Sequence, residues 1–304
     1  MGDTTTVPDF AEESAVAAVS SAELDGVLWD PISTAAVSRS HPRFDERVLD
    51  AWCGDGASAL PTAELVGIGG LVDAVDLDDS RVALARERGG ERMPQLRLHV
   101  ADVTAWEPTG YDLVQCVLGL ERFRDLDAGT RHLIERARPG GRVAITAWAN
   151  GALEPLPELL AAALPGAGAD DRSPADRDAA TGADAADRDA TDSDDTGATD
   201  TTDTATDTDT DTAFELPDTA GTLAHWLTEL GLVGVRADAV QRHVDLTAEL
   251  AWKVVQATHL RSTIAHLEAV EQAAVRERFL AAVAEHDVQR IDLATLIAVG
   301  HRPE

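Results

Sequence analysis

The sequence predicts an α/β protein with a doubly wound, mostly parallel sheet that is covered by helices on both faces. Two observations support this prediction. Five short apolar runs alternate with stretches of helical periodicity in the first half of the chain: 47–52, 72–77, 96–100, 112–118 and 142–148. The first three runs each have an acidic residue within two positions of their end, followed by a turn. Strands that read as nearly continuous apolar segments are typical of a parallel sheet buried on both faces.

The remaining elements follow in order along the chain. A first helical stretch is expected over 8–40, with Asp9 as a cap and Pro31 as a break. Two late strands, 233–240 and 291–299, bring the sheet to seven, with one late antiparallel strand and a helical cap between them. The helices are expected at 57–66, 79–88, 126–137, 153–164, 219–230, 248–261 and 264–286.

One segment differs from the rest in composition. Residues 166–213 are almost entirely Asp, Thr, Ala, Gly and Ser, with few large apolar side chains to offset the entropy of ordering. We therefore predict a disordered acidic insert there. The predicted divisions are an N-terminal helical segment, a cofactor-binding α/β core, this insert, and a C-terminal part with the cap: 1–46, 47–165, 166–213 and 214–304.

The net charge of the chain argues against some classes of binding partner. The 304 residues carry 55 acidic and 25 basic side chains, a net charge of -30, which disfavours binding to nucleic acids or anionic membranes. Lys253 is the only lysine. A GC-rich genome explains arginine in place of lysine but not the acid excess, so we predict a halophilic protein. No apolar stretch approaches the length of a membrane span, and we expect a cytoplasmic protein. With two cysteines, no metal site is expected.

The predicted ligand site lies where the strands end. Asp50 closes the first strand before a loop with Gly54 and Gly56, and Asp76 and Asp102 close the next two. Open α/β sheets bind ligands at this edge. The glycine spacing also fits a dinucleotide such as NAD, but a pyrophosphate would face the carboxylates of Asp50 and Asp55. A cationic ligand without phosphate suits the loop better.

These motifs, in this order, resemble the class I S-adenosylmethionine-dependent methyltransferases, in the branch similar to the ubiquinone/menaquinone-biosynthesis type. The resemblance covers about 47–149 and extends more weakly to Pro303. It rests on Asp50–Gly56 and on the three acids, together with Tyr111-Asp112-Leu113-Val114 and the turn Arg138-Pro139-Gly140-Gly141-Arg142. The resemblance implies a Rossmann-like methyltransferase fold and S-adenosyl-L-methionine as cofactor.

The resemblance also implies roles for individual residues. Asp76 falls on the acid that binds the ribose, Leu77 on the residue that packs against adenine, and Asp102 on the acid that meets the adenine amino group. The full set of cofactor-binding candidates is Asp50, Trp52, Cys53, Gly54, Gly56, Asp76, Leu77, Asp102, Val103 and Cys116. Trp52 departs from the pattern, because the family has a small residue there, and Asp55 replaces a hydroxyl residue.

The implied function is methyl transfer to a small molecule by in-line displacement. The sequence names no catalytic residue, because the reaction needs alignment and exclusion of water more than a catalytic triad. His259, on one helix face with Trp252, is the best candidate for a general base. A non-catalytic binding or regulatory protein is the alternative, since Trp52 could weaken the cofactor site. The acceptor and the oligomeric state cannot be read from the sequence.

Overall fold

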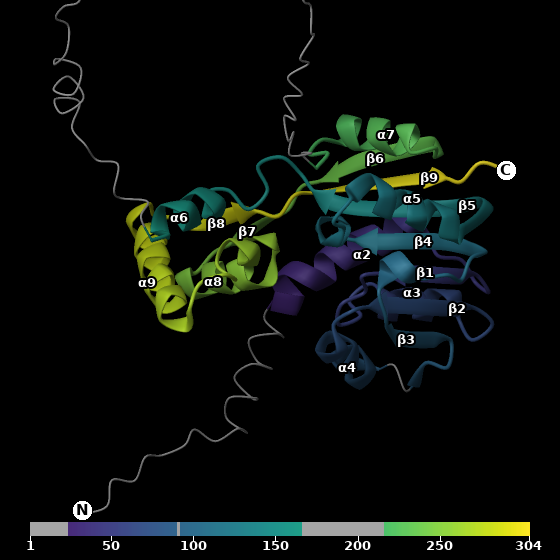
Figure 1. Ribbon diagram of the computed structural model, residues 1–304, viewed down its shortest axis with the longest axis horizontal. Helices are drawn as coiled ribbons and strands as arrows, with labels where there is room; N and C mark the ends of the chain where they lie inside the picture. The colour runs from purple at the N-terminus through teal and green to yellow at the C-terminus, as the bar shows by residue number, and fades with distance from the viewer. Residues whose placement is uncertain (1–23, 90–91, 166–215) are drawn as a thin grey trace, which may run out of the picture. The chain divides into compact units, whose positions relative to one another are not determined.

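The computed structural model describes residues 24–89, 92–165 and 216–304 (Figure 1). Their centre is a seven-stranded sheet of order β3-β2-β1-β4-β5-β9-β6. Neighbouring strands from β3 to β5 pair in parallel, and β9 runs antiparallel to both of its neighbours. This agrees with the predicted doubly wound, mostly parallel sheet with one late antiparallel strand. The strands are β1 Arg47–Ala51, β2 Leu71–Asp76, β3 Leu96–Val100, β4 Tyr111–Val117, β5 Ala137–Trp148, β6 Val233–Val240 and β9 Thr295–His301.

Helices cover both faces of this sheet because its strands alternate between two apolar clusters. In β1, Val48 packs with the residues of α3 and Leu49 packs with those of α5 and α7. Adjacent strand residues point to opposite faces, so both faces of a central strand must be apolar. The helices around the sheet are α2 Asp30–Ser40, α3 Ala59–Val66, α4 Asp79–Arg88, α5 Leu126–Arg136 and α7 Ala220–Glu229, with the short turns η3 Val103–Ala105 and η4 Leu120–Arg122.

A helical cap packs at one end of the sheet (Figure 1). It has its own apolar cluster, in which Phe279 and Trp252 pack ring against ring at 5.8 Å. Val117, Leu118 and Trp148, at the ends of β4 and β5, pack against this cluster. The cap therefore meets the carboxyl edge of the sheet. It consists of α6 Leu156–Ala163, β7 His243–Asp245, α8 Ala248–Ala257, η6 His259–Thr263, α9 Ala269–Glu285 and β8 Arg290–Asp292.

Three expectations about these elements were wrong. The apolar run 291–299 is not one strand, because β8 pairs with β7 in the cap and β9 joins the main sheet. The cap helices α8 and α9 are shorter than predicted, because η6 and the turn after it separate them. Pro31 does not end the first helix: the chain stays helical from the π-helical turn η1 Asp25–Trp29 into α2, and the helix changes type directly before this proline. The predicted cap at Asp9 and the predicted insert at 166–213 lie outside the described residues, and the predicted divisions stay predictions.

Arg142 attaches α2 to the sheet. Its guanidinium forms a fork with the Glu46 carboxylate at 2.9 and 2.6 Å and donates to the backbone oxygens of Ser40 and His41 at the end of α2. Both side chains of the ion pair are nearly buried. A buried pair of this kind is costly to break from one side, because the remaining charge is left without a partner.

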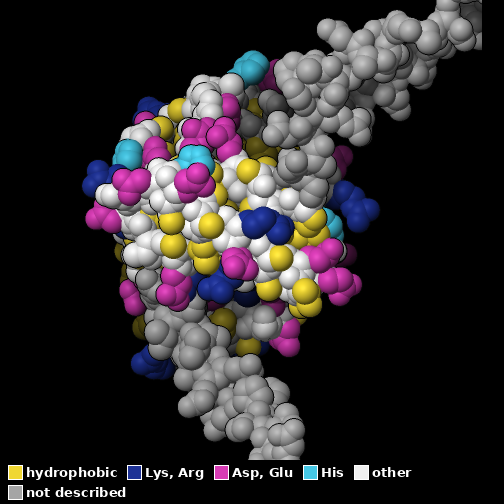
Figure 2. Space-filling view, turned by 90° about the vertical axis from the view of Figure 1, so that its left-hand side faces the viewer, with side chains coloured by type: hydrophobic (Ala, Val, Ile, Leu, Met, Phe, Trp, Pro, Cys, Tyr) yellow, Lys and Arg dark blue, Asp and Glu magenta, His cyan; other side chains and the backbone are white. Residues whose placement is uncertain are grey.

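On the face shown in Figure 2, the acidic side chains are scattered rather than gathered into one patch. Among the described residues, no helix is both long enough and apolar enough to cross a membrane.

We predict that Arg142→Ala lowers the free energy of unfolding by about 3 kcal/mol. The substitution leaves the buried Glu46 carboxylate without its cation and removes the hydrogen bonds to the backbone at the end of α2. Chemical denaturation in high salt measures this. Arg138→Ala is the matched control in the same turn: Arg138 pairs with Asp112 but is half exposed, so its loss should cost less than about 1 kcal/mol. Equal losses in the two variants would contradict the role given to Arg142.

Candidate functional site

The loop after β1 holds its shape through glycine conformations and backbone hydrogen bonds. Gly54 and Gly56 have φ of +55° and +89°, a region that only glycine adopts without strain. The Cys53 N–H donates to the Val75 oxygen, and the Gly56 N–H to the Cys53 oxygen. A Cβ atom on Gly56 would lie 3.1 Å from the Ala85 Cβ, so this glycine lets α4 pack against the loop.

Asp76 joins three loops through one carboxylate. Its side chain is completely buried at the end of β2. It accepts hydrogen bonds from Gly54 N–H at 2.9 Å and from Asp78 N–H at 3.0 Å. Arg122, in η4, donates to both of its oxygens at 3.2 Å. The buried charge is thereby paired with a cation and with backbone donors, as burial of an ion requires.

Trp52 lies beneath Arg122. Its backbone has φ of +58°, unusual for a bulky residue. The indole is 9% exposed and packs edge-on against Phe123, with the Arg122 guanidinium 4.6 Å from the ring centre. Its Nε1–H is buried and has no hydrogen-bond partner among the described residues. The indole therefore forms part of the floor of the site, and the guanidinium lies between this floor and Asp76.

Asp50 is a buried carboxylate with one free oxygen. Oδ2 accepts from Ser58 Oγ at 2.7 Å and from Gln115 Nε2 at 3.1 Å. Oδ1 is buried and has no partner among the described residues. Burial raises the pKa of Asp50 to about 7, against the lowering effect of the hydrogen bonds from Ser58 and Gln115.

Asp55 forms an ion pair that accounts for an acid at this position. Arg88, at the end of α4, forms ion pairs with Asp55 at 2.8 Å, Asp30 at 3.4 Å and Asp25 at 3.7 Å. The glycine loop is thus connected to α4 and to the N-terminal helix. The acid that departs from the family pattern attaches this loop to its surroundings.

The residues expected at the adenine end, Leu77, Asp102 and Val103, differ from one another in exposure. Leu77 is 57% exposed, directly after the buried Asp76. Asp102 caps η3, accepting from Thr104 N–H at 2.8 Å and Thr104 Oγ1 at 2.7 Å. Val103 is fully buried in the cluster beneath. An exposed leucine beside buried polar groups is suited to packing against a flat apolar ligand.

The two cysteines, Cys53 and Cys116, are buried, and their thiols stay protonated. Burial raises the pKa of the Cys116 thiol to about 12, and burial also raises that of Cys53 well above its ordinary value. A thiol that stays protonated is a poor nucleophile. Cys116 lies beneath Gly119, where a Cβ atom would come within 2.8 Å of the sulfur and 2.8 Å of the Trp52 Cβ. Gly119 is therefore needed for the chain to turn closely over the indole.

Two functional candidates were missed in the sequence. Arg122 and Glu121 follow β4 in η4, at the same edge as the predicted acids. A basic residue directly after β4, in a loop expected to meet the ligand, was the available signal. Glu121 contacts His259 of the cap, the histidine that the sequence favoured, at 3.4 Å.

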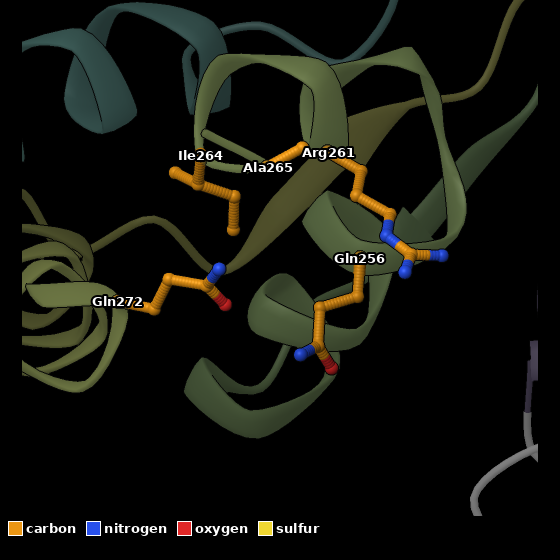
Figure 3. Close-up of a pocket in the computed structure, with 5 residues that line it drawn as sticks. All are labelled: Gln256, Arg261, Ile264, Ala265 and Gln272. Atoms are coloured by element: carbon orange, nitrogen blue, oxygen red, sulfur yellow. The ribbon is translucent and has the colours of Figure 1, made fainter. Parts of the chain in front are cut away.

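The cap also contains a cavity of about 390 Å³ (Figure 3). It is lined by Gln256, Arg261, Ile264, Ala265 and Gln272. Arg261 and His259 lie two residues apart in η6, and such residues face different sides of a 3₁₀-helix. The cavity therefore opens on another side of η6 than the contact with Glu121.

Comparisons with known proteins agree on one family. Residues 48–141 match the family model described as a methyltransferase domain. The chain is 29% identical over 122 residues to nocamycin O-methyltransferase of Saccharothrix syringae. This aligned region covers 39% of this chain and 44% of that protein. The chain is 30% identical over 141 residues to a ubiquinone biosynthesis O-methyltransferase of Xanthomonas euvesicatoria, which covers 45% and 56%.

Among solved structures, the YcgJ protein of Bacillus subtilis is similar over 90% of this chain and 98% of that one, with a TM-score of 0.51 and 13% identity. At this identity the similarity shows the fold, which is the Rossmann-like methyltransferase fold. The chain spans about half the length of the curated relatives it matches.

The buried Asp50 gives a pH-dependent prediction. Its pKa is about 7 in the folded protein against 3.8 ordinarily, so the folded state holds the proton more tightly. The contribution of Asp50 to stability is therefore greatest in acid and is lost as the pH rises toward 7. Asp50→Asn removes this titration. The free energy of unfolding of the variant minus that of the wild type should therefore be larger at about pH 8 than at about pH 5, by about 1–4 kcal/mol. Denaturant titrations at the two pH values test this, and a pH-independent difference would contradict it.

Proposed function

Residues 48–141 form a domain of the class I S-adenosylmethionine-dependent methyltransferases, and from this premise we propose that the chain transfers a methyl group to a small molecule. The observation that carries the proposal is the row of acids at the carboxyl ends of β1 and β2, with Asp50 and Asp76 both completely buried. Buried carboxylates at this edge favour a cationic ligand without phosphate.

The residues of the site fit S-adenosylmethionine. In this site, the Asp50 Oδ1 acceptor and the Trp52 Nε1–H donor are buried and lack partners among the described residues. A ligand with an ammonium and a carboxylate group offers a partner of the right kind to each, and Leu77 offers an apolar surface to adenine. One contact must be exchanged. Arg122 occupies both oxygens of Asp76, so a ribose diol can bind Asp76 only where Arg122 withdraws.

When bound, this cofactor supplies a methyl group on a positively charged sulfur with a neutral leaving group. The chain's own residues have to bind, orient and exclude water. In our proposal Asp76 holds the ribose, the loop from Trp52 to Gly56 shapes the space beside it, and Cys116 is the floor under Gly119. Asp102 and Val103 belong to the adenine end. The methyl group moves by in-line displacement, which needs no covalent intermediate on the protein.

The acceptor is proposed to be a small organic molecule that enters between the sheet edge and the cap. Trp148 at the end of β5 and His259 in η6 lie there, with ring centres 6.5 Å apart. The relatives are named as methyltransferases of small molecules, which supports the catalytic function rather than the non-catalytic alternative. A cytoplasmic location and adaptation to high salt stay predictions from composition.

Calorimetric titration in high salt tests the proposal. S-adenosylmethionine and its demethylated product S-adenosylhomocysteine should bind with micromolar affinity, and NADH should not. Binding of NADH alone would favour an oxidoreductase. Absence of binding by any of the three, with the fold intact, would contradict the proposed function.

Arg122→Ala should bind S-adenosylhomocysteine about tenfold more tightly, because the ribose no longer has to displace a guanidinium from Asp76. Arg124→Ala, at an exposed position two residues on, is the matched control and should bind like the wild type. Weaker binding by Arg122→Ala would show instead that Arg122 holds the ligand.

A further inference from the structure

The turn η4 carries opposite charges on consecutive residues, and they reach in different directions. Arg122 pairs with Asp76 on the sheet, whereas Glu121 Oε1 lies 3.4 Å from His259 Nδ1 in the cap. A single turn thus separates the carboxylate proposed to hold the ribose from an imidazole. His259 therefore comes close to the edge where the transferred methyl group must lie.

His259 has the surroundings of a reactive group. Its ring lies beside Trp148, at the carboxyl end of β5. The His259 and Glu121 side chains are 39% and 26% exposed, so the pair is partly desolvated but remains accessible. The contact with Glu121 uses Nδ1. If Nδ1 carries the proton that faces the carboxylate, Nε2 presents a lone pair.

Protonation near neutrality suits proton transfer. Burial lowers the pKa of His259, so that the imidazole is neutral and able to accept a proton at neutral pH. Burial raises the pKa of Glu121 to about 7. Arg122, on the residue after Glu121, turns its guanidinium to Asp76 and not to this pair. A new charge on the imidazole would be stabilised by the adjacent carboxylate.

The other histidine–carboxylate pairs among the described residues lack this placement. His99 contacts Asp73 at 3.0 Å, inside a network in which the Tyr111 hydroxyl also donates to Asp73. His225 contacts Glu229 at 3.4 Å on the surface of α7, with both side chains more than half exposed. Of these histidine–carboxylate pairs in the described part of the chain, it is the pair of His259 and Glu121 that joins the cap to the carboxyl edge of the sheet.

We propose that His259 is the general base of the methyl transfer, that the acceptor carries an acidic hydroxyl group, and that Glu121 is the positioning residue for His259. This inference rests on the proposed function. The acceptor oxygen gives its proton to His259 Nε2 and forms the new bond to the methyl carbon. The electron pair of the broken carbon–sulfur bond returns to sulfur, leaving a neutral thioether, and the imidazolium beside Glu121 later loses its proton to water.

A spectroscopic titration tests this without knowledge of the natural acceptor. The probe is 4-nitrophenol, an acidic phenol whose anion absorbs visible light, added to the full chain saturated with S-adenosylhomocysteine. At about pH 7 the wild type should raise the ratio of phenolate to phenol about tenfold, which corresponds to lowering the phenol pKa by about one unit. His259→Gln should abolish this increase while keeping its affinity for S-adenosylhomocysteine.

Two further variants separate positioning from structure. Glu121→Gln keeps the size of the side chain but not the charge, so it should give an intermediate increase in phenolate. His225→Gln removes a histidine at the same distance from a glutamate on an exposed helix face, and should match the wild type.

The outcomes distinguish the two proposals. If the wild type binds S-adenosylhomocysteine but does not ionise the phenol, or if His259→Gln ionises it equally well, the role of His259 is wrong and the proposed function stands. If the wild type does not bind S-adenosylhomocysteine, the proposed function fails and this inference fails with it.

Discussion

The candidate site depends on the burial of one charge, the carboxylate of Asp76. A carboxylate without solvent must be paired, because leaving it alone costs several kcal/mol. Its partners come from the glycine loop, the turn into α4 and the turn η4. These three segments are separated in the sequence, and their hydrogen bonds to this one carboxylate hold them together. One of these partners is a guanidinium from the chain itself, that of Arg122.

Trp52 illustrates how the first loop tolerates a residue that its pattern disfavours. A left-handed backbone costs a bulky side chain about 1–2 kcal/mol. Packing against Phe123, contact with Gly119 and the cation over its ring offset this cost. The indole therefore belongs to the apolar cluster under the sheet edge rather than projecting freely from the loop.

The sheet and the acids at its edge could be predicted because both follow from local patterns. Buried strands are continuous apolar runs, and Asp50 and Asp76 end two of them. The split of 291–299 could not be predicted, since Ile291 and Leu296 are equally apolar although they enter different sheets. Arg122 was missed for a related reason. Its partner depends on the direction in which η4 leaves β4, and that direction is set by tertiary packing rather than by neighbouring residues.

The chain segment that joins β6 to β7 and the one that joins β8 to β9 lie side by side. The Leu293 N–H donates to the Arg242 oxygen, and β7 pairs with β8 directly beyond them. The excursion between β6 and β9 is thus a closed loop whose ends are fastened together. Such a loop can be lengthened, shortened or exchanged without altering the alignment of β6 on β9. This part of the cap can therefore change while the sheet and the acids at its carboxyl edge keep their arrangement.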